Sequence, residues 1–183
     1  MTRETYTRVT DILYPFSGLD KVNPEVLRKA SERGASVHHL CGGIIEGLGT
    51  PEIDPELQGY ITSFESWWKD DFEIIAHEQR FYDDELEITG QADLIIKHGD
   101  NVHLIDLKTS ASVSKSWPLQ LSAYRNMIKS TYYIDNISIV QLKRDGSIPK
   151  IHTYADHYKQ FLNCYEVYKY FYKKKETIDI ELI

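Results

Sequence analysis

The sequence is poor in cysteine and has no long hydrophobic runs. Cys41 and Cys164 are its two cysteines, too few to build a zinc or iron–sulfur site by themselves, and we expect both to be reduced thiols. No apolar run approaches the roughly 20 residues that span a bilayer. The start, "MTRETYTRVT", lacks the apolar stretch of a signal peptide. These absences predict a protein that is not secreted, has no membrane partner and holds no iron–sulfur cluster.

The chain also lacks an excess of positive charge. It carries 21 Lys and Arg against 28 Asp and Glu, a net charge of −7, which argues against non-specific binding of nucleic acid by the whole surface. A nucleic-acid enzyme is still allowed, because carboxylates that bind cations make a site locally acidic. With 42% hydrophobic and 27% charged residues and no internal repeat or linker, we expect one soluble globular domain over residues 1–183.

Helix and strand patterns follow one another in an order typical of a mixed sheet. Helix starts are indicated where an N-cap residue precedes proline, at Asn23–Pro24 and Asp54–Pro55. Alternating apolar residues indicate strands. The expected elements are helices at 24–47 and 55–68, strands at 72–82, 85–96 and 101–109, a helix from 116, strands at 137–146 and 150–154, and a helix at about 155–175. This order predicts an α/β or α+β fold with a mixed central sheet flanked by helices.

Two aspartates interrupt the apolar strands of one expected hairpin, "GQADLIIKHGDNVHLIDLKTS". If the turn is His98 to Asn101, Asp93 lies directly opposite Asp106, and their Cβ atoms are about 4.5–5.5 Å apart. Lys108 falls on the same face, because side chains alternate with period two. One interpretation is a solvent-facing hairpin with scattered charges. The other is a site in which two carboxylates and an ammonium act together.

Opposed carboxylates repel each other and favour a compensating cation. Their hard oxygen ligands suit Mg²⁺ or Mn²⁺. A metal of this kind can activate water, polarise a phosphoryl oxygen and support in-line attack on phosphate. Lys108 can orient the attacking water or stabilise developing negative charge. The second interpretation therefore predicts one or two Mg²⁺ or Mn²⁺ ions and phosphoryl chemistry.

The motifs around this hairpin resemble the PD-(D/E)XK nuclease superfamily, most closely its RecB-like and phage-type exonuclease branch. The pattern of that branch is Gly-x-x-x-His on a helix, Gly-x-x-Asp on a strand, Asp-x-Lys on the next strand and Gln-x-x-x-Tyr on a helix. Here the same order appears as Gly34 to His38, Gly90 to Asp93, Asp106 to Lys108 and Gln120 to Tyr124. Four elements in order across residues 34–124 are more specific than any one alone.

The resemblance implies a restriction-endonuclease-like core and a role for each matching residue. It implies catalytic roles for Asp93, Asp106, Lys108, Gln120 and Tyr124, and metal ligation by His38, Asp93, Asp106 and the backbone carbonyl of Leu107. Glu78, on the preceding strand, occupies a place where some members carry an additional acidic residue. Iron–sulfur cysteines found in some relatives are missing here.

Without the resemblance, several of these residues have simpler interpretations. His38 is then a packed core histidine, and Gln120 with Tyr124 is a pair on one helix face. His38 and His39 point about 100° apart on a helix, so only one of them can reach the site. The segment "YEVYKYFYKKKE" can either guide a nucleic-acid strand or pack its aromatic rings in the core.

The resemblance implies a metal-dependent DNA exonuclease of recombination, repair or replication. The alternatives are a structure-specific or restriction-type endonuclease on the same core, and a nucleic-acid-binding module that has lost catalysis. The expected partners are DNA with a free or single-stranded end and recombination or replication proteins. The expected location is the cytoplasm of a bacterial or phage-infected cell.

Overall fold

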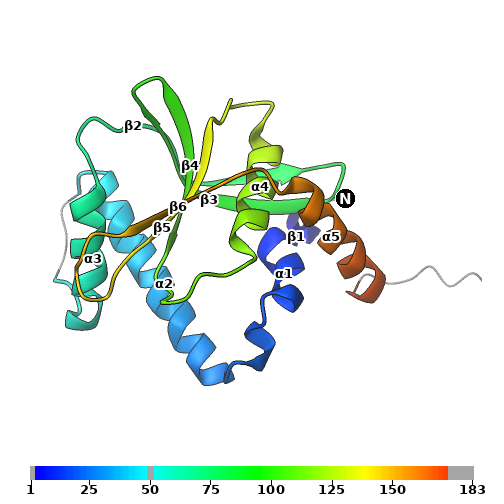
Figure 1. Cartoon of the computed structure of the whole chain (residues 1–183), viewed down its shortest axis with the longest axis horizontal. Helices are drawn as coiled ribbons and strands as arrows, with labels where there is room; N and C mark the ends of the chain where they lie inside the picture. The colour runs from blue at the N-terminus through cyan, green and yellow to red at the C-terminus, as the bar shows by residue number, and fades with distance from the viewer. Residues whose placement is uncertain (1–2, 49–51, 173–183) are drawn as a thin grey trace, which may run out of the picture.

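A mixed sheet lies at the centre of the computed structural model, which describes residues 3–48 and 52–172 (Figure 1). Within these residues the sheet has six strands, in the order β1-β3-β4-β5-β6, with β2 paired to β3. The strands are β1 (Thr7–Arg8), β2 (Glu73–Asp83), β3 (Ile88–His98), β4 (Asn101–Lys108), β5 (Asn136–Gln141) and β6 (Lys150–Tyr154). The β1–β3 and β4–β5 pairs are parallel, whereas the other pairs are antiparallel.

Helices cover both faces of this sheet (Figure 1). They are α1 (Val9–Leu13), α2 (Pro24–Ile45), α3 (Pro55–Trp67), α4 (Trp117–Ile128) and α5 (Tyr158–Tyr172), with short 3-10 helices η1 (Arg3–Thr5), η2 (Tyr14–Phe16) and η3 (Leu19–Lys21). The α/β fold with a mixed sheet flanked by helices is the predicted one. None of the helices in the described ranges is both long and apolar enough to span a membrane.

The predicted helix starts are confirmed. The Asn23 side chain accepts a hydrogen bond of 2.8 Å from the Glu25 amide, and the Asp54 side chain accepts one of 2.9 Å from the Glu56 amide. Proline follows each cap at the first helical position, where its missing N–H costs no helical hydrogen bond. The N-cap therefore fixes where α2, the helix that carries His38, begins.

Two hydrophobic cores form, one on each face of the sheet. One core joins α1, α4 and α5 to the sheet through residues such as Ile95 and Leu104, and the other joins α2 and α3 through residues such as Leu94 and Ile105. This split follows from strand alternation, because neighbouring residues of β3 and β4 point to opposite faces. The functional residues carried by α2 and α4 thus approach the sheet from opposite sides.

The sheet divides at the predicted site. On one edge β3 pairs with β2 along most of its length, and on the other it pairs with β1 at Ile88 and Thr89 and with β4 from Leu94 to His98. Beyond the Leu94–Ile105 pair, β4 no longer pairs with β3 but continues alongside β5 as far as Lys108. Asp93 therefore lies where β4 leaves β3, and on that edge its side chain, instead of the β3 backbone, bonds the backbone of β4.

Some predicted boundaries were wrong. The strand expected at 137–146 ends at Gln141, and the last helix begins at Tyr158 rather than near 155; its predicted end at 175 lies outside the described residues. The short elements β1 and α1 were not predicted, because two and five residues are too few to show a periodicity.

Candidate active site

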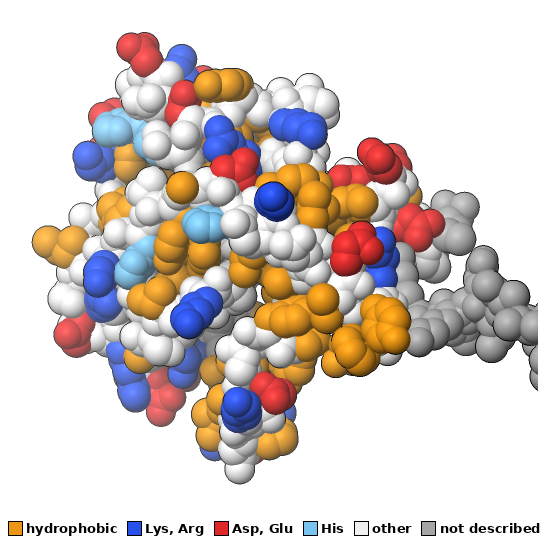
Figure 2. Space-filling view, turned by 45° about the vertical axis from the view of Figure 1, so that its right-hand side comes forward, with side chains coloured by type: hydrophobic (Ala, Val, Ile, Leu, Met, Phe, Trp, Pro, Cys, Tyr) orange, Lys and Arg blue, Asp and Glu red, His pale blue; other side chains and the backbone are white. Residues whose placement is uncertain are grey.

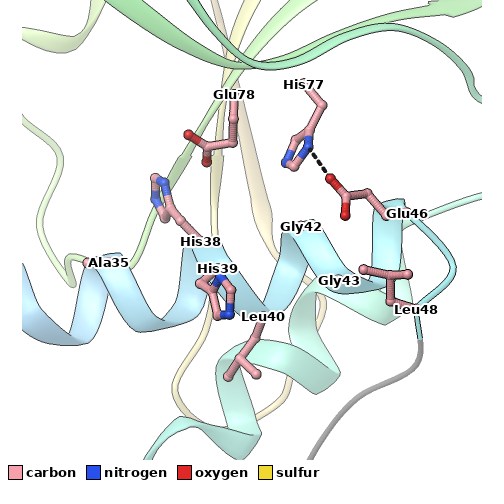
Figure 3. Close-up of a pocket in the computed structure, with 10 residues that line it drawn as sticks. All are labelled: Ala35, His38, His39, Leu40, Gly42, Gly43, Glu46, Leu48, His77 and Glu78. Carbon is pink, nitrogen blue, oxygen red and sulfur yellow. Dashed lines mark ion pairs between the residues drawn. The ribbon is translucent and has the colours of Figure 1, made fainter.

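Helix α2 brings His38 onto the sheet at the end of β4. Its Nε2 lies 3.0 Å from the Leu107 carbonyl oxygen, and its Nδ1 lies 3.4 Å from Oδ1 of Asp93. His38 is half-buried, whereas His39 is exposed and points away from Glu78 in the close-up (Figure 3). His38 is thus the one of the two adjacent histidines that contacts the aspartate; the helical phase predicted that only one could reach the site, and the resemblance indicated His38.

Asp93 is a buried carboxylate at the division of the sheet. The pairing of β3 with β4 follows the predicted register, from His98–Asn101 to Leu94–Ile105. Beyond the last pair, the Leu107 amide of β4 donates a 2.7 Å hydrogen bond to Oδ2 of Asp93. The side chain of Asp93 is therefore bonded to the backbone of β4, and its other oxygen faces His38.

Asp106 is held by two donors on its own side of the sheet. Nζ of Lys108 lies 2.6 Å from its Oδ2, and Nε2 of Gln120 donates a 2.8 Å hydrogen bond to its Oδ1. The same Gln120 nitrogen lies 3.1 Å from the hydroxyl of Tyr124. Because Gln120 and Tyr124 are four residues apart on α4, they lie on one helix face, and that face is turned to Asp106. The interpretation of this pair as a plain helix-surface pair does not hold, since both residues are buried.

Gly90 makes room for Tyr124. A Cβ built at position 90 would lie 2.3 Å from Cε1 and 2.6 Å from Cδ1 of the Tyr124 ring. Both distances are far inside van der Waals contact, so any side chain at this position would displace the ring. The glycine of "GQAD" is therefore needed for the approach of α4 to β3.

Glu78 lies next to Asp93 on the neighbouring strand. His77 pairs with Leu94 and Gln79 with Ala92, which places Glu78 opposite Asp93. Its backbone φ is +49°, the left-handed region that non-glycine residues rarely adopt. As a result the consecutive residues His77 and Glu78 both point toward α2 (Figure 3).

Gln91 bonds Glu78 directly, and Arg80 in turn bonds Gln91. Nε2 of Gln91 donates a hydrogen bond to Oε2 of Glu78, and Nη2 of Arg80 donates one of 2.8 Å to Oε1 of Gln91. Gln91 lies two residues before Asp93 on β3, so the series of hydrogen bonds from Arg80 through Gln91 to Glu78 ends beside the aspartate. Backbone strain and side-chain bonding together fix the Glu78 carboxylate at the site.

The group of residues best placed for a metal differs in part from the predicted one. In the described part of the chain, His38, Glu78 and Asp93 offer ligand atoms that all lie within 4.8 Å of one another. Asp106 is not in this group: Gln120 donates a hydrogen bond to its Oδ1, and its Oδ2 is buried without a hydrogen-bond partner among the described residues although Nζ of Lys108 lies 2.6 Å away. A carboxylate has about four acceptor sites, so ligation by Asp106 stays a prediction, as does that by the Leu107 carbonyl.

The donor chemistry fits a small divalent cation. Two carboxylates and one imidazole are ligands that Mn²⁺ accepts, and carboxylate oxygens suit Mg²⁺. Burial raises the pKa of Asp106 to about 6 in spite of Lys108, and the charge of Asp93 adds to this rise. A bound cation would therefore stabilise the ionised carboxylates.

The histidine and Asp93 titrate in opposite directions. Burial alone would lower the pKa of His38, but the Asp93 carboxylate raises it to about 9. Burial alone would raise the pKa of Asp93, but His38 holds it below its usual range. Burial also opposes the charge on Lys108, yet Asp106 raises its pKa. At neutral pH His38 is therefore protonated, and a cation that binds it must displace that proton.

A cavity of about 1000 Å³ opens from the metal-ligand group between α2 and β2. Its lining includes His38 and Glu78 at one end and the ion pair of His77 with Glu46, whose Nδ1 and Oε1 atoms lie 3.6 Å apart, at the other (Figure 3). The ligand atoms of His38 and Glu78 thus border a space large enough for part of a substrate.

The family model of the PD-(D/E)XK nuclease superfamily matches residues 18–175. The chain belongs to this superfamily. Nucleases of the superfamily cleave nucleic acids with divalent metal ions, and the matched residues include the whole of the site described above. The match confirms the predicted superfamily but does not specify the RecB-like branch.

Comparisons with individual proteins add less. No match was found among curated proteins. Among solved structures 17 chains match. One of them, titled "Crystal structure of SSO0001", is 17% identical, with a TM-score of 0.37, over 91% of this chain and 76% of its own.

The sequence predicted most of the residues that come together at the site, but not the position of Glu78 or the residues that hold it. It indicated His38, Asp93, Asp106, Lys108, Gln120 and Tyr124, which the fold brings to one region. The position of Glu78 depends on a bulge near Ile75 in β2 and on its own left-handed backbone. The supporting residues Gln91 and Arg80 were missed. Their one signal was the polar Gln91 two residues before Asp93.

Substitution of Gly90 tests the close approach of α4. Gly90→Ala is expected to destabilise the fold by about 1–3 kcal/mol through overpacking and to reduce cleavage by displacing Tyr124. In the Tyr124→Ala background the same substitution should cost much less, because the clashing ring is gone. Chemical denaturation of the four proteins gives the coupling energy; additive effects would show that position 90 does not contact the ring. Gly34→Ala, where a Cβ would lie 3.8 Å from Thr109 Oγ1, is the control.

Proposed function

We propose that this chain is a metal-dependent deoxyribonuclease that acts on DNA ends as an exonuclease. The observation that carries the proposal is that the ion pair of buried Asp106 with partly exposed Lys108 lies beside the group of His38, Glu78 and Asp93. A structural ion pair alone would not require a second cluster of ligand atoms next to it. A cation site and a fixed ammonium together can polarise a phosphodiester and stabilise the negative charge that develops during its hydrolysis.

In this proposal His38, Glu78 and Asp93 hold the cation, and Asp106 completes its surroundings. When bound, a Mg²⁺ or Mn²⁺ ion supplies positive charge to the scissile phosphate and lowers the pKa of water. Asp93 keeps its orientation through the Leu107 amide, and Glu78 keeps its own through Gln91. The ligand oxygens are thus positioned before substrate arrives, which limits the reorganisation needed during the reaction.

Lys108 has the charge and position to act on the phosphate. Its side chain is 24% exposed and lines a groove, and its Nζ lies 2.6 Å from Oδ2 of Asp106, so the carboxylate holds the ammonium at a place that substrate can reach. Because its pKa is raised by Asp106, it stays protonated at neutral pH. In that form it stabilises negative charge that develops on the phosphate and orients the attacking water.

Gln120 and Tyr124 act on the chemistry through Asp106. The Gln120 amide bonds one oxygen of Asp106 and leaves the other to Lys108. Tyr124 lies behind Gln120 and is 4% exposed, and burial raises the pKa of its hydroxyl. It therefore stays neutral and serves as a positioning residue for the amide.

Preference for an end follows from the charge of the chain. Tight binding of continuous duplex relies on many cationic contacts to phosphates, and the net charge of −7 disfavours it. A strand end that reaches the cation site needs fewer such contacts, because the ion supplies local positive charge. We further propose a role in recombination, repair or replication, the processes in which DNA ends arise.

A time course on end-labelled linear DNA and on closed circular single- and double-stranded DNA tests the function. With Mg²⁺ or Mn²⁺, linear DNA should be degraded while the closed circles survive, and a chelator should stop the reaction. Rapid nicking or linearisation of closed circles would favour the endonuclease alternative. Absence of cleavage with either metal, in a protein that still binds DNA, would favour a binding module.

Lys108 can be separated from the ligands by substitution. Lys108→Ala should leave Mn²⁺ affinity within a few-fold, because an ammonium is not a ligand, and should lower single-turnover cleavage by about 100-fold or more. Lys97→Ala, at the far end of the same hairpin, is the matched control and should cleave as the unmodified protein does. Near-normal cleavage by Lys108→Ala would show that the lysine only neutralises Asp106.

A further inference from the structure

A second groove reaches the catalytic residues from the side opposite the His38 cavity. It has a volume of about 600 Å³, and Lys108 and Gln120 lie among its lining residues. One wall is the N-terminal segment of α1, η2 and η3, and the other is the loop of residues 109–116 between β4 and α4. In Figure 1 this N-terminal segment leads out to the start of α2 at the bottom of the view.

The N-terminal wall presents aromatic rings to solvent. Tyr14 is 46% exposed and Phe16 41% exposed, and both line the groove. Leu19, also in the lining, is 41% exposed. Figure 2 shows hydrophobic side chains on the projecting segment at the bottom of the view and on the body beside it. Rings of this kind, exposed along a groove, are suited to stacking on unpaired bases.

The opposite wall carries hydroxyl groups. Ser110, Ser112, Ser114 and Ser116 alternate along the loop, and Lys115 stands among them. Each hydroxyl offers one donor and two acceptor sites, so a serine can bond a phosphate or a sugar even where it also bonds the loop. This wall therefore suits a polar backbone, whereas the aromatic wall suits bases.

The hydroxyl wall is held in place from below. Nε2 of Gln141, at the end of β5, donates hydrogen bonds of 2.8 Å to the Ser110 carbonyl and 3.1 Å to the Ala111 carbonyl. Nε2 of His152 lies 3.0 Å from Oε1 of the same Gln141. The loop is thus fixed to the sheet, and a ligand need not order it on binding.

The charges in the groove are few. Its lining holds Lys108 and Lys115 against Asp11, and Lys108 is already paired with Asp106. Binding there must therefore depend on stacking and hydroxyl contacts more than on neutralised phosphates. Paired bases are covered by their neighbours on both faces, so the rings can be used fully only by an unpaired strand.

We propose that this groove binds single-stranded DNA and leads it to the catalytic residues, with bases on Tyr14 and Phe16 and the sugar–phosphate backbone on the serine loop. The inference rests on the proposed nuclease function and names the form of its substrate. It assigns to Tyr14 and Phe16 a role in binding the strand and none in the chemistry.

Fluorescence anisotropy with labelled oligo(dT), and with a blunt duplex of the same length, tests the proposal in the presence of a chelator. The Tyr14→Ala/Phe16→Ala protein should bind the single strand at least about tenfold more weakly, with little change for the duplex. Tyr14→Phe/Phe16→Tyr should bind normally, because the rings remain. Tyr133→Ala removes another exposed ring, 79% accessible and beyond the far end of α4, and should bind as the unmodified protein does.

A second variant and the salt dependence keep the test independent of folding defects. Ser112→Glu adds a negative charge at an exposed position in the lining and should weaken single-strand binding without lowering Tm. The slope of log K against log [salt] should be shallow, about −0.7 to −1.4 for one or two neutralised phosphates. A much steeper slope would indicate many neutralised phosphates, more than the two lysines of the groove can supply, and would overturn the proposal.

The two proposals fail differently. Cleavage of linear DNA together with unchanged single-strand binding by the Tyr14→Ala/Phe16→Ala protein would overturn the groove and leave the nuclease intact. Ring-dependent binding without cleavage would support the groove and overturn the nuclease. No measurable binding of oligo(dT) by the unmodified protein would overturn the groove.

Discussion

The buried carboxylate of Asp93 is the contact on which the rest of the site depends. It accepts the Leu107 amide at 2.7 Å with one oxygen and lies 3.4 Å from His38 with the other. The first contact holds β4 to β3 where their pairing ends, and the second fixes α2 against the sheet. An ionised group 9% exposed is costly unless it is bonded on all sides. The Leu107 amide contributes to that bonding throughout, together with protonated His38 before a cation binds and with the cation beside Glu78 once it has displaced that proton.

The second aspartate shows why the site is assembled from two sides of the sheet. Asp106 faces α4, where Gln120 and Tyr124 can reach it, while Asp93 is contacted by α2. Gly90 permits the approach of α4 to the sheet because it leaves space for Tyr124. Each aspartate also has a cavity on its own side: His38 and Glu78 border one, and Lys108 and Gln120 border the other.

Much of this could be predicted from the sequence, because the strong signals are local. Proline after an N-cap residue marked both long helices at the N-terminal end, and the turn at His98–Asn101 fixed the hairpin register. The place of Glu78 could not be predicted, since it depends on a bulge and a left-handed residue that no spacing shows. The aromatic segment near the C-terminus packs only in part: Tyr165 is buried, whereas Phe171 and Tyr172 are exposed, and a role in guiding a strand stays a prediction.

Calorimetric titration with Mn²⁺ in two buffers of different ionisation enthalpy tests the central claim most directly. Because the pKa of His38 is raised to about 9, binding at neutral pH should release about one proton and should strengthen as the pH rises. Asp93→Asn should abolish binding and Glu78→Gln should weaken it at least about tenfold. Glu46→Gln, in the same cavity but paired with His77, should have no effect. Wild-type affinity in Asp93→Asn, or binding without proton release, would contradict the assignment of this site.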